Sequence, residues 1–321
     1  QRIGAVSLSL TGAGVGVAVV DTGIDLANKD LSVGSASYSA VSRTAADDNG
    51  HGTHVAGIIA ALNNTIGVVG VAPQAKVYAV KVLDRSGSGT DSSILAGLNW
   101  VSKNAAAVSP AIRVVNMSLG RPGTLNDNPT LRQAVQVLAQ KGIAVVVAAG
   151  NDPALEVSQQ VPATYPEVIA VASTTAKNGL STYPGFSGIA ADTASFFTSD
   201  GALVAAPDGS GYIGVTVSAP GEDEEDVSST ASITSVGILS LKVGGGTVRM
   251  SGTSMAAPHV AGVAALLQQQ AAGALTVEDV RRKIANGAAN LSAPYGSPTS
   301  SYTFDGDLEG ILSAPGALST P

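Results

Sequence analysis

Apolar residues occur along this chain in two alternating patterns. Short runs rich in Val, Ile and Ala predict buried strands, and longer stretches with helical spacing of apolar positions predict helices. We expect strands at 15–21, 76–83, 114–119, 144–149 and 168–173, and helices at 51–62, 92–104, 130–141, 254–270 and 277–286, the last capped by Thr276. Alternation of fully apolar strands with helices is typical of a mostly parallel sheet with helices on both faces, which predicts an α/β fold.

The alternation breaks between residues 182 and 247, where Gly, Ser and Thr are frequent. We interpret this stretch as loops and short strands that elaborate the surface of the same domain. Five acidic residues stand in a row at 222–226. Two interpretations of this run stay open: it binds basic substrate side chains or a cation, or it is a solvated loop.

The last part of the chain, about residues 291–321, is rich in Ser, Pro and Gly. We expect an irregular tail that runs over the surface. Asp305, Asp307 and Glu309 alternate within it like a fragment of a calcium loop, which is a weak signal without further ligands.

Composition narrows the class of protein. The chain has 321 residues, of which 45% are hydrophobic and 13% are charged, as in a globular protein with a sizeable core. The net charge of −7 disfavours nucleic-acid partners. The sequence has no cysteine, which excludes disulfides, thiolate metal sites and a cysteine nucleophile. No apolar run is long enough to span a membrane, and the start at Gln1 without a leader suggests a mature or trimmed form.

Ser254 is a candidate nucleophile because it stands where an apolar helix is expected to begin. An amide at a helix start has no intrahelical acceptor, so it stabilises negative charge such as an oxyanion. Pro258, four residues on, is tolerated in a first turn and costs about 3 kcal/mol in mid-helix, which supports a helix start close to Ser254. The alternative is an ordinary N-cap serine.

His51 is the candidate base, because an alcohol needs a neighbouring group to take its proton. It opens its predicted helix, where its ring can face a cleft. The other two histidines, His54 and His259, lie within helical patterns among apolar residues and are expected to be packed core histidines. Two histidines three apart could also bind zinc, but no third clustered ligand and no HExxH motif accompany them.

Asp21 ends an apolar strand, at the edge of a parallel sheet where catalytic groups gather. There it could orient the His51 ring and stabilise its charged form. Glycines at 12, 14 and 16 look like a phosphate-binding loop, but they precede a strand instead of following one, which argues against a dinucleotide site.

The residues around these three candidates form long, specific blocks. They read AVVDTGID at 18–25, NGHGTHVAG at 49–57 and GTSMAAPHVAG at 252–262. These blocks closely resemble the subtilisin-like serine proteases, the subtilase family, in which Asp, His and Ser follow in this order. The resemblance implies a serine endopeptidase with Asp21, His51 and Ser254 as its triad, acting through an acyl-enzyme.

The resemblance also implies residues that bind the substrate. Asn151, in the block AAGN at 148–151, corresponds to the second oxyanion donor beside the Ser254 amide. Ser118, Leu119 and Gly120 correspond to the strand that pairs with an extended substrate, which favours broad specificity. Ala148, Ala149 and Gly150 would form one wall of the P1 pocket, and their small side chains suggest an apolar P1 preference.

A structural calcium site is implied as well. The loop LNNTIGV at 62–68 resembles a family loop that binds Ca²⁺. The implied ligands are the Asp30 carboxylate, the Asn64 side chain and the carbonyl groups of Leu62, Ile66 and Val68. The family's N-terminal arm supplies another ligand, and this chain is expected to begin after it, which would leave the site incomplete.

We therefore expect one subtilisin-like peptidase domain over 1–321, with a family-atypical insertion at about 176–216 and an irregular tail at about 291–321. The expected partners are protein or peptide substrates and a prosegment or protein inhibitor, without nucleic acid or membrane, for a secreted monomer. A catalytically silent homologue that acts as a binding protein, and an esterase or transferase with the same triad, are the alternatives. The filled catalytic positions argue against the first, and the extended-strand block argues against the second.

Overall fold

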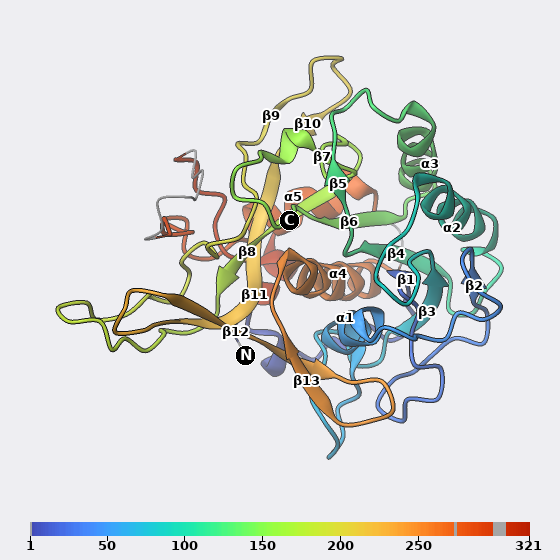
Figure 1. Cartoon of the computed structure of the whole chain (residues 1–321). Helices are drawn as coiled ribbons and strands as arrows, with labels where there is room; N and C mark the ends of the chain where they lie inside the picture. The colour runs from blue at the N-terminus through green and yellow to red at the C-terminus, as the bar shows by residue number, and fades with distance from the viewer. Residues whose placement is uncertain (1, 273–274, 298–305) are drawn as a thin grey trace.

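The computed structural model describes residues 2–272, 275–297 and 306–321 (Figure 1). The strands of its main sheet are β1 (Gly16–Asp21), β2 (Tyr38–Ser39), β3 (Lys76–Lys81), β4 (Ile112–Met117), β6 (Ala144–Ala148), β8 (Ile169–Thr175), β11 (Val215–Val227), β12 (Ile233–Leu241) and β13 (Thr247–Met250). They form a 9-stranded sheet in the order β13-β12-β11-β8-β6-β4-β1-β3-β2. Neighbours from β2 to β11 pair in parallel, and β12 and β13 continue the sheet antiparallel. The predicted mostly parallel α/β fold is confirmed.

The remaining elements surround this sheet. The helices are α1 (His51–Ala60), α2 (Asp91–Asn104), α3 (Pro129–Gln140), α4 (Thr253–Gln270), α5 (Val277–Asn286) and α6 (Ala314–Ser319), with 3-10 turns η1 (Ala5–Ser7) and η2 (Val157–Gln159). Two small two-stranded sheets pair β5 (Arg121–Pro122) with β7 (Gln160–Val161), and β9 (Val204–Ala205) with β10 (Tyr212–Ile213).

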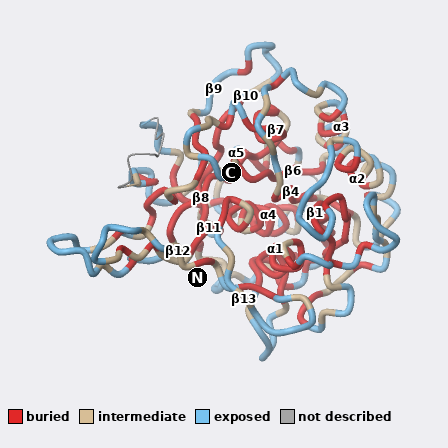
Figure 2. The backbone as a smooth tube through the Cα atoms, viewed as in Figure 1, coloured by how far each residue is buried: buried red, intermediate tan, exposed pale blue. Residues whose placement is uncertain are grey.

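Side chains of successive strand residues point to opposite faces of the sheet and form two cores. Val17 and Val19 of β1 join the core that α1, α4 and α5 cover, whereas Ala18 and Val20 join the core under α2 and α3. Both faces are therefore buried, as the burial colouring shows (Figure 2). This double cover explains why the parallel strands are continuously apolar instead of alternating.

Helix α4 contains Pro258, which the sequence places near the helix start. The helix begins at Thr253, so the proline lies in the second turn. Proline has no N–H, so the carbonyl of Ser254, four residues earlier, lacks its usual donor. The hydroxyl of Ser118 donates to that carbonyl at 2.8 Å instead. A side chain from the segment after β4 therefore offsets part of the cost of proline within this helix.

The region after residue 182 differs from the expected loops and short strands. Strand β11 has 13 residues and pairs in parallel with β8 inside the main sheet, and β12 has 9 residues. The acidic run 222–226 lies in β11, so its interpretation as a solvated loop is wrong for Glu222 and Glu225, which are both fully buried. Bulges in β11 break the two-residue alternation of the strand, which hides this register from a periodicity count.

Glu222 and Glu225 form a buried carboxyl pair. Glu222 accepts a hydrogen bond from the Ser235 hydroxyl, and Glu225 accepts one from the Phe196 N–H at 2.8 Å. Oε1 of Glu222 and Oε2 of Glu225 have no partner. Burial, followed by the neighbouring carboxyl group of Glu222, raises the pKa of Glu225 well above its usual range. One proton held between the two groups would satisfy both remaining oxygens.

This pair predicts that stability falls as pH rises from the acidic range. The folded chain keeps a proton on Glu225 that the unfolded chain releases above pH about 4.3, so the free energy of unfolding falls as pH rises between that value and the raised pKa. We expect Glu225→Gln, which replaces the shared proton by an amide donor, to lose less stability than the unchanged chain from about pH 5 to about pH 10.

Urea unfolding across this pH range measures the effect. Glu224→Gln is the matched control, because Glu224 lies one residue away in β11 and is not buried. If the stability of Glu225→Gln falls with pH as steeply as that of the control, the pair does not hold the proton.

The segment between β8 and β11 contains the small β9–β10 sheet and covers most of the insertion expected at about 176–216.

The C-terminal tail is less irregular than expected, because α6 buries Ala314 and Ala317 in the main core. Of the weak acidic triplet, Asp305 lies outside the described residues, and Glu309 accepts a hydrogen bond from the Ser218 hydroxyl at 2.8 Å. None of the described helices is long and apolar enough to cross a membrane.

Candidate active site

A cleft of about 760 Å³ opens at the carboxyl ends of the parallel strands. His51, Asn151 and Ser254 all line it, although 100 residues or more separate them pairwise along the chain. Asp21 lies directly behind His51 at the end of β1 and is fully buried. The crossovers of the parallel sheet bring these residues to one edge, as expected for this class of fold.

Asp21 and His51 are joined by a hydrogen bond. Nδ1 of His51 donates to the two carboxylate oxygens of Asp21 at 2.8 and 3.0 Å. Because Nδ1 carries the proton, the neutral ring keeps Nε2 as an acceptor. The His51 side chain is 25% exposed, whereas Asp21 is fully covered, so only the ring faces the cleft.

The charges around the His51 ring determine its pKa. Burial acts to lower the pKa of His51, but the negative charge and hydrogen bond of Asp21, with the charge of Asp47, outweigh burial and raise the pKa above 6.5. Burial lowers the pKa of His54 and of His259 to about 4. The ring of His54 donates from Nε2 to the carbonyl groups of Ile238 and Val248, which agrees with a packed core histidine.

Asp47 holds the chain around the start of α1, and the sequence analysis did not single it out. It is 7% exposed and accepts from the backbone of Gly50 at 2.9 Å and from the hydroxyl of Thr53 at 2.6 Å. It also accepts from Thr22, whose hydroxyl in turn accepts from the N–H of Gly52. One carboxylate therefore ties the loop that presents His51 to the end of β1.

Ser254 is the second residue of α4 and lines the cleft. Its backbone N–H has no acceptor among the described residues, so this donor faces the cleft together with the positive end of the helix dipole. Its hydroxyl donates to the carbonyl of Ser118 at 3.3 Å, and no hydrogen bond joins it to His51 in the described chain. The structure brings the expected nucleophile and base into one cleft, without a hydrogen bond between them among the described residues.

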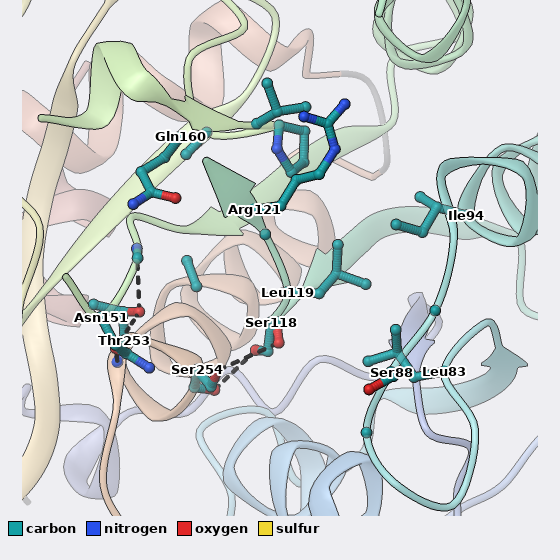
Figure 3. A pocket seen from close by; sticks show the side chains of 18 of the residues that line it. Leu83, Ser88, Ile94, Ser118, Leu119, Arg121, Asn151, Gln160, Thr253 and Ser254 are labelled. Carbon is teal, nitrogen blue, oxygen red and sulfur yellow. Dashed lines mark hydrogen bonds between the residues drawn. The ribbon is translucent and has the colours of Figure 1, made fainter. Parts of the chain in front are cut away.

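Asn151 is oriented by Thr253, as Figure 3 shows. The Oδ1 atom of Asn151 accepts from both the N–H and the hydroxyl of Thr253, at 2.9 and 2.8 Å. With the oxygen held in this way, the Nδ2 atom remains as a donor at the cleft. Thr253 stands next to Ser254 in the sequence. Its contact with Asn151 is visible only in the folded chain.

The expected substrate-binding residues lie around the same cleft, with one exception. Ser118, Leu119, Gly120, Ala148 and Gly150 line it. Ala149 does not: its side chain is fully buried in the core beneath α2 and α3, because successive residues at the end of β6 face opposite sides. Residues 118–120 continue from β4 without belonging to a strand.

Asp30 and Asn64, two of the expected calcium ligands, are in contact through a hydrogen bond. Asp30 is 2% exposed, and its Oδ2 atom has no partner. Gly67 has a φ of +59°, and a Cβ there would stand 2.6 Å from this oxygen, so the loop leaves space beside it. In this structure the Nδ2 atom of Asn64 donates to Oδ1 of Asp30, whereas its Oδ1 accepts from the Ile66 N–H. A buried carboxylate oxygen without a donor suits a hard cation, so the residues fit Ca²⁺ once the Asn64 amide turns its oxygen inward.

No group of three or more His, Asp or Glu side chains that could hold a metal occurs in residues 2–272, 275–297 and 306–321. Within those residues, the alternative that His51 and His54 bind zinc therefore has no third ligand.

Known proteins resemble this chain over most of its length. The profile of the subtilase family matches residues 12–304. Subtilisin Savinase from Lederbergia lenta is 39% identical over 291 residues, which cover 90% of this chain and 89% of that protein. An alkaline protease from Alkalihalobacillus alcalophilus is also 39% identical, over 90% of this chain and 63% of its own length. The crystal structure of a cold adapted subtilisin-like serine proteinase superposes with a TM-score of 0.68 at 30% identity, over 96% of this chain and 89% of that one. This chain belongs to the subtilase family and is a serine endopeptidase.

Proposed function

We propose that Asp21, His51 and Ser254 form the catalytic triad of this endopeptidase. The Ser254 hydroxyl attacks the substrate carbonyl, and Nε2 of His51 takes its proton. Asp21 stabilises the resulting imidazolium through the bond to Nδ1. His51 then protonates the leaving amine, and a water molecule releases the acyl group from Ser254 by the reverse sequence of proton transfers.

One observation carries this proposal: Asp21 is hydrogen bonded to His51, and His51 lines the same cleft as Ser254. Proton transfer requires the Ser254 hydroxyl to leave the carbonyl of Ser118 and turn toward His51. That rotation breaks one hydrogen bond of 3.3 Å, which is long for an O–H donor and therefore weak.

Two N–H donors, one at the start of α4 and one in the segment after β6, stabilise the oxyanion. The backbone N–H of Ser254 and the Nδ2 of Asn151 have no acceptor among the described residues and border the cleft where the attacked carbonyl would lie. Thr253 holds the amide of Asn151 before substrate arrives. Donors arranged in advance are worth more, because the reaction then requires no reorganisation of the site.

Active-site labelling tests the assignment. A fluorophosphonate should react with one serine per chain, and peptide mapping should locate the label on Ser254. The fraction of peptide hydrolysis that is lost should equal the fraction of chains that carry the label. A label on another serine, or continued hydrolysis by fully labelled protein, would contradict the triad; an absence of both labelling and hydrolysis would indicate a silent homologue.

We propose that the substrates are extended peptides that run along residues 118–120. Leu119 and Ala148 both line the cleft, and as walls of the P1 position they would suit an apolar P1 side chain. Backbone pairing supplies affinity without regard to sequence, so we expect broad specificity beyond P1. A prosegment or a protein inhibitor would fill the same cleft.

A broad-specificity endopeptidase would digest the proteins of its own cytosol, so we propose that it acts outside the cell, as a secreted monomer. The net charge of −7 supports peptides over nucleic acids as partners.

We also propose that the loop 62–68 and Asp30 hold a structural Ca²⁺. Asp30, Asn64 and the carbonyl groups of Leu62, Ile66 and Val68 are the proposed ligands. The ion would supply positive charge to a carboxylate oxygen that is otherwise buried without a partner. The loop adopts its shape only in the folded chain, so binding would stabilise the fold without taking part in the chemistry.

Calcium removal is expected to lower the melting temperature. A ligand that binds only the folded state at a hundredfold excess over its Kd adds about 2.7 kcal/mol, which corresponds to a Tm change on the order of 5 °C. Melting the Ser254→Ala protein with calcium and with excess chelator measures this effect without self-digestion. Asp30→Ala in the same background should melt at the same temperature in both conditions, whereas Glu224→Ala should still respond to calcium. Identical melting curves for the parent in calcium and in chelator would exclude the site.

A further inference from the structure

Asn116 is a buried polar side chain that the proposed mechanism does not use. Successive residues of β4 face opposite sides of the sheet: Val114 joins the core that α1, α4 and α5 cover, whereas Val115 and Met117 join the other core. By this alternation Asn116 faces the same side as Val114, and it is fully buried. A buried amide gives up its hydrogen bonds with water, a cost that an apolar side chain in this place would not have.

The amide of Asn116 makes a single hydrogen bond within the described residues. Nδ2 donates to the hydroxyl of Ser118, two residues further along the chain and on the same face, at 2.9 Å. Oδ1 of Asn116 is buried without a partner in that part of the chain. Buried polar groups are usually satisfied. Any gain from this amide therefore comes through Ser118.

The Ser118 hydroxyl connects the amide to the nucleophile. Its oxygen lies 2.8 Å from the carbonyl oxygen of Ser254, a contact that Figure 3 shows. The hydroxyl has one proton, and a carbonyl oxygen can only accept. While Asn116 presents an N–H to the hydroxyl oxygen, the hydroxyl proton is directed to Ser254. Asn116, Ser118 and the Ser254 carbonyl thus form a relay of two hydrogen bonds.

The carbonyl of Ser254 depends on this relay because Pro258 has no N–H to offer it. The peptide group after Ser254 is held at its other end, where the Met255 N–H donates to the Gly252 carbonyl at 2.9 Å. With both ends held, the first turn of α4 presents Ser254 to the cleft in one direction. The Ser254 hydroxyl also donates to the Ser118 carbonyl, so two contacts join the two serines.

We propose that Asn116 is a positioning residue for the nucleophile. Its Nδ2 keeps the Ser118 hydroxyl as a donor to the Ser254 carbonyl, and this donor fixes the direction of Ser254 in the cleft. The inference rests on the proposed function, in which Ser254 attacks the substrate. Attack requires a defined geometry of the reacting atoms, so a small displacement of Ser254 slows the reaction. Asn116 itself is not among the residues that line the cleft, and it acts through Ser118.

Asn116→Leu is expected to lower kcat by about tenfold, the factor that corresponds to one hydrogen bond. The substitution removes the N–H at similar volume, so the Ser118 hydroxyl is free to turn away from Ser254. KM should stay within about twofold, because the peptide groups of residues 118–120 are unchanged. The rate of fluorophosphonate labelling at Ser254 should fall by the same factor as kcat, since this small reagent does not need the extended strand. Asn116→Ala removes the same donor without added bulk and should give the same losses.

A double-mutant cycle shows whether Asn116 acts through Ser118. Ser118→Ala interrupts the relay at its middle and should lower kcat by a similar factor. In that background Asn116→Leu should cause no further loss, because the two changes remove one interaction. Ser118→Thr keeps a hydroxyl at this position, so in that background Asn116→Leu should again lower kcat.

Val114→Ala is the matched structural control. Val114 lies two residues before Asn116 on the same face of β4 and is fully buried. The substitution leaves a cavity in the core, so it should lower the melting temperature. It does not touch the relay, so kcat per labelled Ser254 should stay unchanged. Melting curves of all variants separate lost stability from lost positioning.

The outcomes distinguish this inference from the proposed function. A loss from Asn116→Leu that is as large in the Ser118→Ala background as in the unchanged chain would overturn the relay. An unchanged kcat in both Asn116→Leu and Asn116→Ala would overturn it too, as would an equal loss of kcat in Val114→Ala. Hydrolysis that does not depend on Ser254 would instead overturn the proposed function.

Discussion

Replacing Ser254 by alanine is expected to lower kcat for peptide hydrolysis by about a millionfold, as loss of the catalytic serine does in subtilisin. The variant loses the only oxygen that can form the acyl-enzyme. The donors of Asn151 and the Ser254 backbone remain, so hydrolysis about 10³- to 10⁴-fold above that in water should persist.

The fold should survive this change. The hydroxyl of Ser254 makes one hydrogen bond of 3.3 Å to the Ser118 carbonyl, and its removal takes away a single oxygen atom at the cleft. Turnover, circular dichroism and melting temperature measured on one sample check both statements. Ser251→Ala is the control, because this exposed serine lies three residues upstream and should keep full activity. Native spectra with undiminished turnover in Ser254→Ala would remove Ser254 from the mechanism.

Asp21→Asn is expected to lower kcat by about 10⁴-fold, the loss found when the triad aspartate of a serine protease becomes asparagine. The amide cannot stabilise the imidazolium, and its N–H group favours the wrong tautomer of His51. The hydrogen bonds at 2.8 and 3.0 Å from Nδ1 are the contacts that this substitution alters.

The same substitution should move the pH profile. His51 must be neutral to accept the Ser254 proton, so activity rises as pH passes the pKa of His51. Burial lowers that pKa, but the hydrogen bond and charge of Asp21 raise it above 6.5 overall, so the midpoint of the unchanged enzyme should lie above 6.5. Without the Asp21 charge the burial effect dominates, and the midpoint should fall.

A pH profile of kcat/KM for both proteins measures this shift, and the other histidines do not confuse it. Burial lowers the pKa of His54 and His259 to about 4, so His51 is the histidine that titrates near neutral pH. A midpoint that stays in place in Asp21→Asn, or an activity maximum near pH 4, would exclude His51 as the base.

The two types of site residue in this protein differ in how far local sequence defines them. Asp21, His51 and Ser254 stand at the ends of a strand and at the starts of two helices, and the short motifs around them are contiguous. Gln160 also lines the cleft, but it lies in a two-residue strand after a 3-10 turn, where neither apolar periodicity nor a sequence motif predicts its position. Its place in the cleft depends on Gly150 and on the pairing of β7 with β5.

The order of residues along the chain was enough to predict the α/β class, five of the parallel strands (β1, β3, β4, β6 and β8) and the members of the expected triad. Continuous apolar runs and helical spacing are local properties, so they survive without knowledge of the fold. Helix boundaries were predicted to within one residue for α2, α3 and α4, and α5 begins and ends where predicted, after its expected cap Thr276, because a capping side chain acts locally.

Other features became visible only in the folded chain. The acidic run of β11 is charged in sequence, yet Glu222 and Glu225 are buried because Ser235 and the Phe196 backbone supply hydrogen bonds from distant segments. Ala149 does not line the cleft, because its side chain points into the core at the end of β6. A composition or a motif records which groups a chain carries, whereas the burial and pairing of polar groups depend on neighbours that meet only after folding.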